Sequence, residues 1–275
     1  MTSIVSPAQI DAYERDGFYI ARGLIPREEL ASLREHYMSL HAKAPIPGVY
    51  EPDLNYNGDD PLRVYPRMMH PHRWDDKSQK YLLDRRYYPI LRLLMNDEPV
   101  AAQSMFYFKP PGAKGQTFHQ DNFYLRVRPA TCMAAWLAVD AADAGNGGLS
   151  VLPGSHKWDL ICPESGLVDQ QSGAITNVTK EKTTGLLEVV LAAGDCLFFN
   201  GSLIHGSGKN TSTTRWRRSL ICHYIPLFKS EQVSDFYYPL LGFDGQSVEK
   251  ELVSHGGSPC GGTDGNAIDT SPLVV

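Results

Sequence analysis

The sequence has 275 residues, of which 42% are hydrophobic and 21% are charged, so one large domain with a substantial core is expected. Its net charge of −5 excludes the basic field that draws proteins to nucleic acid or anionic membranes, which favours a small-molecule substrate. No stretch resembles a membrane span or a secretory signal, and the five cysteines lack CxxC spacing. We therefore predict a cytoplasmic protein without disulfides or a thiolate zinc site. The sequence leaves its oligomeric state open.

The first part of the chain has helical patterns. Ser6 before Pro7 is typical of a helix start, and this helix should end near Gly17, ahead of a short strand at 18–21. Pro26 opens a second predicted helix. The apolar residues at helical spacing in that helix are Leu30, Leu33, Tyr37 and Leu40.

Two further segments complete a helical N-terminal part, residues 1–98. Residues 44–75 are rich in Pro, Asn, Asp and Gly and predict a long ordered loop or a lid. Residues 79–95 return to a helical pattern, which Pro89 could divide into two pieces.

From residue 99 the pattern changes to short apolar or alternating runs separated mostly by Gly, Pro, Asn or Asp. The runs are 101–108, 123–127, 131–139, 149–152, 187–191, 196–200 and 217–225. They predict a mainly β fold, a double-stranded β-helix (jelly roll, cupin-like) core over 99–228 with flanking N-terminal helices. We expect one domain over 1–242 and a Gly-rich, mobile C-terminal tail over 243–275.

Two histidines and an aspartate carry the main chemical signal. The segment TFHQDNFYL places His119 and Asp121 two residues apart, so on a strand their side chains project to the same side. His205 follows another apolar run and could supply a third ligand. Two imidazoles and one carboxylate leave open metal positions for a co-substrate and O2, as in non-haem iron oxygenases, whereas zinc usually keeps a single open position. Alone, the His-x-Asp pair is weak; the distant histidine and a nearby arginine strand strengthen it.

A dicarboxylate co-substrate needs a buried cation, and the segment TTRWRRSLICHYI offers three arginines. On a strand, Arg217 shares one face with His223, whereas Arg218 lies on the other face and Arg215 precedes the strand. We predict that Arg217 points inward and interpret Arg215 and Arg218 as solvated charges at the strand edge.

Four segments, in order, share a pattern with a known family: DGFYIARGLI, KPPGAKGQTFHQDNFYL, AAWLAVDAADAGNGGLSVLPGSH and AGDCLFFNGSLIHGSGKNTSTTRWRRSLICHYI. Over roughly residues 8–226 the chain resembles the phytanoyl-CoA dioxygenase family of Fe(II)- and 2-oxoglutarate-dependent oxygenases. The resemblance implies that Arg217 binds the co-substrate, although the family spacing appears stretched by one residue, so Arg218 or Arg215 stays possible. The implied iron ligands are His119, Asp121 and His205.

The resemblance also suggests a co-substrate pocket containing Ser207, Trp136 and, on the strand before KPP, Gln103. Each has a plainer alternative: a turn cap for Ser207, core packing for Trp136 and a satisfied strand residue for Gln103. His156 is interpreted as a turn residue and His223 as a side chain that hydrogen-bonds within its strand; neither is a predicted ligand.

The implied cofactors are Fe(II), 2-oxoglutarate as co-substrate and O2. Because Asp121 is present where a small residue would make room for halide, the expected chemistry is hydroxylation, or another oxidation that starts from the same hydrogen abstraction. Succinate and CO2 would be released.

The substrate should lie over the open iron face, between the segment after the His-x-Asp pair and the 44–75 loop, with the 157–183 insertion as a further boundary. The candidate substrate residues are Asn122, Tyr124, Arg126 and Arg67, with Phe123, Tyr65 and Met69 beside them. The two arginines would suit an anionic substrate. Its identity is not determined by the sequence, because function is set by the site rather than by the fold.

Two alternatives from other classes stay open: a cupin-type metal-dependent isomerase or hydrolase, and a non-catalytic ligand-binding jelly roll. A cupin enzyme would more often show three or four His or Glu ligands and would not need a buried arginine. A binding module would need neither feature.

Overall fold

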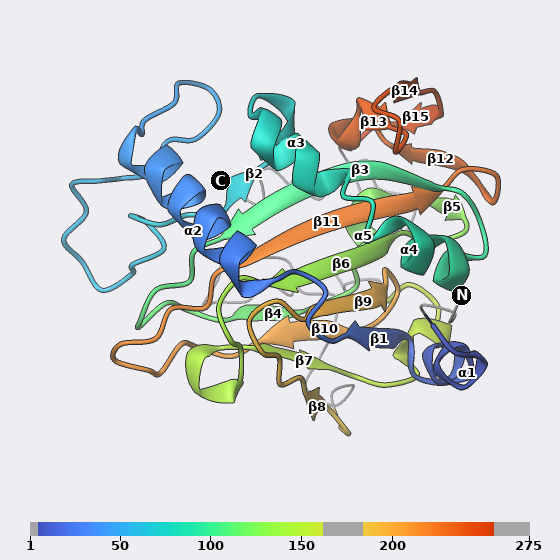
Figure 1. The fold of residues 1–275 in the computed structure, drawn as a ribbon, viewed down its shortest axis with the longest axis horizontal. Coiled ribbons are helices and arrows are strands. Elements are labelled where there is room, and N and C mark those ends of the chain that lie inside the picture. The colour runs from blue at the N-terminus through green and yellow to red at the C-terminus, as the bar shows by residue number, and fades with distance from the viewer. Residues whose placement is uncertain (1–4, 162–183, 256–275) are drawn as a thin grey trace, which may run out of the picture.

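The computed structural model describes residues 5–161 and 184–255. Its strands form a large sheet of eight and a small sheet of four, with a third sheet of three strands beside them (Figure 1). In spatial order the large sheet comprises β1 (Phe18–Ala21), β9 (Cys196–Asn200), β6 (Met133–Ala138), β11 (Ser219–Pro226), β3 (Pro99–Tyr107), β13 (Leu240–Leu241) and β14 (Ser247–Val248), with β2 (Met68–Met69) also paired to β3. This sheet-rich core confirms the mainly β jelly-roll prediction.

The small sheet carries two of the three predicted metal ligands, His119 and His205. Its order is β4 (Gln116–His119), β10 (His205–Ser207), β7 (Leu149–Val151) and β8 (Leu187–Glu188). The third sheet consists of β15 (Glu251–Val253), β12 (Ser230–Ser234) and β5 (Arg128–Pro129).

The helices gather mainly before the core, as predicted. They are α1 (Pro7–Asp16), α2 (Arg27–Ala42), α3 (Asp76–Leu82), α4 (Tyr88–Met95) and the short α5 (Asn122–Leu125), with 3-10 turns at Pro71–Arg73, Ala144–Asn146, Ser155–Lys157 and Asp235–Tyr237. Ser6 caps α1 through a capping box, and Gly17 ends it at φ 86°. Among the described residues, no helix is long and apolar enough to cross a membrane.

Strand β11 separates the two main apolar layers. Its Leu220, Cys222 and Tyr224 belong to the core on the side of the sheet that α2 covers (Figure 1). There Tyr37 of α2 stacks on Phe106 at a centroid distance of 3.8 Å. Ile221 and His223, which alternate with these residues on β11, line the cavity instead, because successive strand side chains point to opposite faces. Helix α2 therefore covers one face of the large sheet, and the opposite face lines the cavity.

Two predictions about elements were wrong. Residues 123–127 were expected to be a strand, but α5 occupies most of them and Arg126 then adopts the left-handed region at φ 55°. The side chain of Asn122 bonds both the N–H and the carbonyl of Val127, and this closes a tight turn that a strand could not contain.

The tail prediction also differs from the structure in its first part. Residues 243–255 include β14, which pairs with β13, and β15, which runs parallel to β12. Composition missed these strands because their stability comes from pairing with distant segments rather than from local propensity. The rest of the predicted tail, 256–275, lies outside the described residues.

Candidate metal centre and its cavity

Two adjacent strands bring the predicted ligands together. His119 on β4 is the register partner of His205 on β10, and Asp121 lies two residues after the end of β4. The Asp121 Oδ1 atom lies 3.3 Å from His119 Nε2 and 3.5 Å from His205 Nε2. All three residues are buried, and their ligand atoms lie within 4.8 Å of one another. They form the one group of this kind in residues 5–161 and 184–255.

Backbone carbonyls fix the protonation of both rings. His119 Nδ1 donates to the carbonyl of Thr117 at 2.8 Å, and His205 Nδ1 donates to that of Leu203 at 3.0 Å. Each Nδ1 therefore carries the proton, and each Nε2 presents a lone pair towards Asp121. The amide of Gln116, 3.2 Å from His119 Nε2, can donate to that lone pair.

The charges of the group suit a divalent cation. Burial lowers the pKa of His205 to about 4, so this ring is neutral near pH 7. Burial opposes ionisation of Asp121, but the hydrogen bond from His223 is among the interactions that hold its pKa well below the usual range. The Asp121 carboxylate and the neutral His205 imidazole are thus ready to bind metal without losing further protons.

His223 makes a contact that the sequence did not predict. Its Nε2 donates to Asp121 Oδ2 at 2.9 Å instead of bonding within its own strand. The available signal was that His223 shares a strand face with Arg217, which also lines the cavity.

Arg217 lies in the same cavity as the three candidate ligands. It is 3% exposed, and it donates from Nε to the Gly147 carbonyl at 3.1 Å and from Nη1 to Ser219 Oγ at 2.8 Å. The rings of Trp136 and Tyr107 lie 5.3 and 5.9 Å from its Cζ. No described carboxylate lies within ion-pair distance of it. Burial lowers its pKa to about 10, so the guanidinium is still charged near pH 7.

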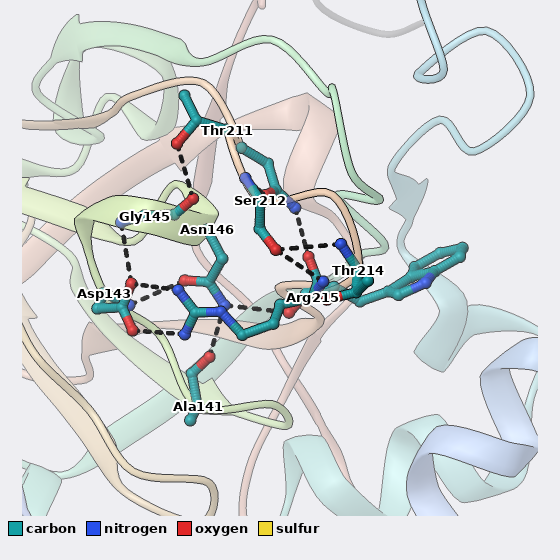
Figure 2. Close-up of polar contacts among 10 residues, drawn as sticks. Ala141, Asp143, Gly145, Asn146, Thr211, Ser212, Thr214 and Arg215 are labelled. Atoms are coloured by element: carbon teal, nitrogen blue, oxygen red, sulfur yellow. Dashed lines mark hydrogen bonds and ion pairs between the residues drawn. The ribbon is translucent and has the colours of Figure 1, made fainter.

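The neighbouring arginines already have carboxylate partners. Arg218 Nε lies 2.7 Å from Asp140, and Arg215 forms a two-pronged pair with Asp143 at 2.6 and 2.8 Å. Figure 2 shows the Arg215 pair within a network that joins loop 211–215 to loop 141–146. There Asn146 donates to the carbonyl of Ala141 at 2.7 Å. This network fixes the loop just before Gly147, the residue that accepts from Arg217.

The other predicted co-substrate residues divide into two groups. Trp136 and Gln103 line the cavity. Ser207 does not, because its hydroxyl accepts from the buried Nζ of Lys109 at 2.9 Å and from the Gln116 N–H at 3.2 Å. Lys109 also donates to the carbonyl of Gly208, and sequence analysis gave no signal for it.

The outer wall comes from several segments. Of the candidate substrate residues, Tyr124, Arg67 and Arg126 line it, with Met69 and Phe123 beside them. Asn122 is absent from the wall because its amide closes the turn after α5, and Tyr65 instead packs against His41, Phe108 and Trp216. The wall residues that the sequence missed are Tyr107, Phe236, Tyr237 and His255.

Comparison with known proteins assigns this arrangement to a family. The family model of phytanoyl-CoA dioxygenase (PhyH) matches residues 13–219, most of the chain. The chain belongs to the phytanoyl-CoA dioxygenase family. It is 25% identical over 264 residues to peroxisomal phytanoyl-CoA dioxygenase of Homo sapiens, covering 91% of this chain and 75% of that protein. It is 29% identical over 244 residues to a probable phytanoyl-CoA dioxygenase of Caenorhabditis elegans, covering 81% and 76%.

Solved structures similar to this family member share its fold. EctD from S. alaskensis with bound Fe superposes with a TM-score of 0.69 at 19% identity, covering 92% of this chain and 90% of that one. The epimerase SnoN from nogalamycin biosynthesis, in complex with Fe3+, alpha ketoglutarate and nogalamycin RO, gives 0.63 at 19% identity, covering 89% and 93%. The predicted phytanoyl-CoA dioxygenase family is thus confirmed, and membership favours the oxygenase over the cupin-type and non-catalytic alternatives.

Proposed function

We propose that this chain is an Fe(II)- and 2-oxoglutarate-dependent dioxygenase of hydroxylase type, with iron held by His119, Asp121 and His205. The observation that carries the proposal is that one cavity contains this donor set and a buried arginine without a carboxylate partner among the described residues. When bound, iron supplies the oxidising chemistry in which O2 and 2-oxoglutarate are consumed, succinate and CO2 are released, and an unactivated substrate C–H bond is hydroxylated or otherwise oxidised.

The donor set fits ferrous iron. Two Nε2 lone pairs and one carboxylate oxygen converge, which matches the two-histidine, one-carboxylate triad of non-haem Fe(II) oxygenases. Such a triad leaves positions for a chelating co-substrate and O2, whereas catalytic zinc sites usually have a single open position.

Arg217 is the proposed partner of the far carboxylate of 2-oxoglutarate. A guanidinium pairs a carboxylate through two parallel hydrogen bonds, and burial strengthens such a pair. Trp136 frames the guanidinium and Gln103 adds a polar group to the same cavity. Ser207 would act from behind the cavity wall, since it fixes Lys109 beside Arg217.

The substrate is a small molecule that lies against the outer wall. Tyr124 and Arg67 offer a hydroxyl and a cation there, and Arg67 donates to Tyr107 at 3.3 Å. Arg126 would shape the wall by holding the backbone of 254–255. Asn122 would act indirectly, through the turn that carries Tyr124.

We also place this enzyme in the cytoplasm, without nucleic-acid or membrane partners. The net charge of −5 supports this placement. Cys132, Cys196 and Cys222 are buried free thiols, as expected in a reducing compartment.

The test is an anaerobic titration of purified protein with Fe(II) and 2-oxoglutarate, monitored by the weak visible charge-transfer band of the chelate. We expect the band in wild type and in Arg15→Ala, whose arginine is paired with Asp16 on the surface. It should be lost in His119→Ala and weakened in Arg217→Ala. Iron binding without any band in wild type would refute the co-substrate, and absence of iron binding would refute the triad.

A further inference from the structure

We propose that His223 is a positioning residue that holds Asp121 in an orientation from which only one carboxylate oxygen reaches the metal. The inference rests on the proposed function, because it concerns the same metal centre. It assigns a role to a side chain that is neither a ligand nor a co-substrate contact.

The two oxygens of Asp121 have different surroundings. Oδ1 faces the Nε2 atoms of His119 and His205, while Oδ2 accepts from His223 Nε2 at 2.9 Å. If both oxygens turned towards the metal, the carboxylate would occupy one of the positions that 2-oxoglutarate and O2 need. The bond to His223 keeps Oδ2 turned away and so preserves an open position.

His223 is itself held rigidly. It is 2% exposed on β11, where Gln103 of β3 and Ala134 of β6 are its register partners on the two sides. The β11–β3 register shifts between His223 and Tyr224, an irregularity of the kind that re-aims side chains next to active sites. A donor fixed by strands on both sides loses little entropy when it binds Asp121.

The surroundings of His223 favour this single interaction. Its Nδ1 has no hydrogen-bond partner among the described residues, so the ring is anchored only through Nε2. Asp121 is the one described carboxylate within ion-pair distance of it. His70, which interacts electrostatically with His223, has a pKa lowered to about 2 by burial, so it adds no competing cation.

A matched pair of variants tests the role. In His223→Gln the amide nitrogen can reach the former Nε2 position and still donate to Asp121, whereas in His223→Asn the side chain is one carbon shorter and its nitrogen reaches only the Nδ1 position. His72→Asn is the control, since this buried histidine bonds Ser104 rather than a ligand. Thermal unfolding of each variant establishes that it is folded.

Fe(II) affinity and the charge-transfer band with 2-oxoglutarate are measured for all four proteins. We expect His223→Asn to weaken iron binding by about 10–100-fold, the usual cost of losing a partner of a metal ligand, and to shift the band. The loss of iron affinity in His223→Gln and in His72→Asn should be less than about 10-fold. If folded His223→Asn binds iron like wild type, or folded His223→Gln loses as much as His223→Asn, the positioning role is wrong. Failure of wild type to bind iron would instead refute the proposed function.

Discussion

The two ends of the cavity are built differently. The inner end consists of side chains on paired strands or within two residues of them: His119 on β4, His205 on β10, Asp121 two residues after β4 and Arg217 two residues before β11. The outer wall combines the end of the 44–75 loop, α5 and the segment that follows β15. The inner end is therefore held by backbone ladders, whereas the outer wall depends on individual side-chain bonds between segments far apart in the chain.

This difference in construction indicates which end of the cavity tolerates sequence changes. Strand pairing fixes side-chain positions closely, as a metal and a co-substrate require. Loop and terminal segments tolerate change more readily, and substrate contacts are commonly made by them. We therefore expect changes at the inner end to abolish the chemistry and changes at the outer wall to alter substrate fit.

The largest effect should come from Asp121→Ala. It removes one ligand and leaves His223 without its only carboxylate partner among the described residues. Losing a hydrogen-bond partner of a metal ligand lowers metal affinity by up to about 100-fold. Losing the ligand itself should lower iron affinity by more than that. Anaerobic Fe(II) titration measures it, and binding close to that of wild type would show that the metal lies elsewhere.

Arg217→Leu should have the next largest effect. Removing one partner of a buried, hydrogen-bonded charge pair costs about 2–5 kcal/mol, so the 2-oxoglutarate dissociation constant should rise at least about 30-fold. Calorimetry with Fe(II)-loaded protein measures the constant, and Arg218→Leu, whose arginine is paired with Asp140, serves as the comparison. An equal rise of the dissociation constant in both variants would contradict the assignment of Arg217, rather than Arg218, as the partner of 2-oxoglutarate.

Arg126→Ala should loosen the outer wall and leave the inner end unchanged. Arg126 donates to the carbonyls of Ser254 and His255, and Asp235 accepts from the His255 backbone and ring at 2.8 Å each. Loss of about 1 kcal/mol of hydrogen bonding should speed amide hydrogen exchange in residues 251–255 about fivefold. Unchanged exchange, or weakened Fe(II) binding, would contradict the separation of the two ends.

A pH dependence of stability should come from Lys109 at the inner end. Burial, with Arg217 nearby, lowers its pKa to about 6 from 10.5, so between these values the unfolded chain binds the extra proton. Its contribution to stability therefore rises with pH over this window, by at most about 1.4 kcal/mol per pH unit. Denaturant unfolding of wild type and Lys109→Met from pH 6.5 to 9.5 measures it. The stability of the variant relative to wild type should fall as pH rises, and a constant difference would show that Lys109 stays charged.

Much of the inner end could be predicted from the sequence. The two-residue spacing of His119 and Asp121 predicted ligands on one side of an extended segment; their side chains do converge, but Asp121 itself is helical, at φ −61° and ψ −33°. The pattern of short apolar runs predicted a jelly roll that can bring a distant histidine beside them. These are consequences of local backbone geometry. The strand prediction for 123–127 was wrong for a related reason: apolar alternation carries no information about the Asn122 bonds that close a turn there.

By itself, the sequence determined the family, the mainly β fold and the three candidate ligands, because these depend on patterns within short segments. Only the tertiary structure decided which arginine lacks a carboxylate partner, that His223 bonds Asp121 across 102 residues, and that residues 243–255 include paired strands. Such contacts depend on strand register and on which segments meet. Those are properties of the whole packed chain, and no local pattern in the sequence records them.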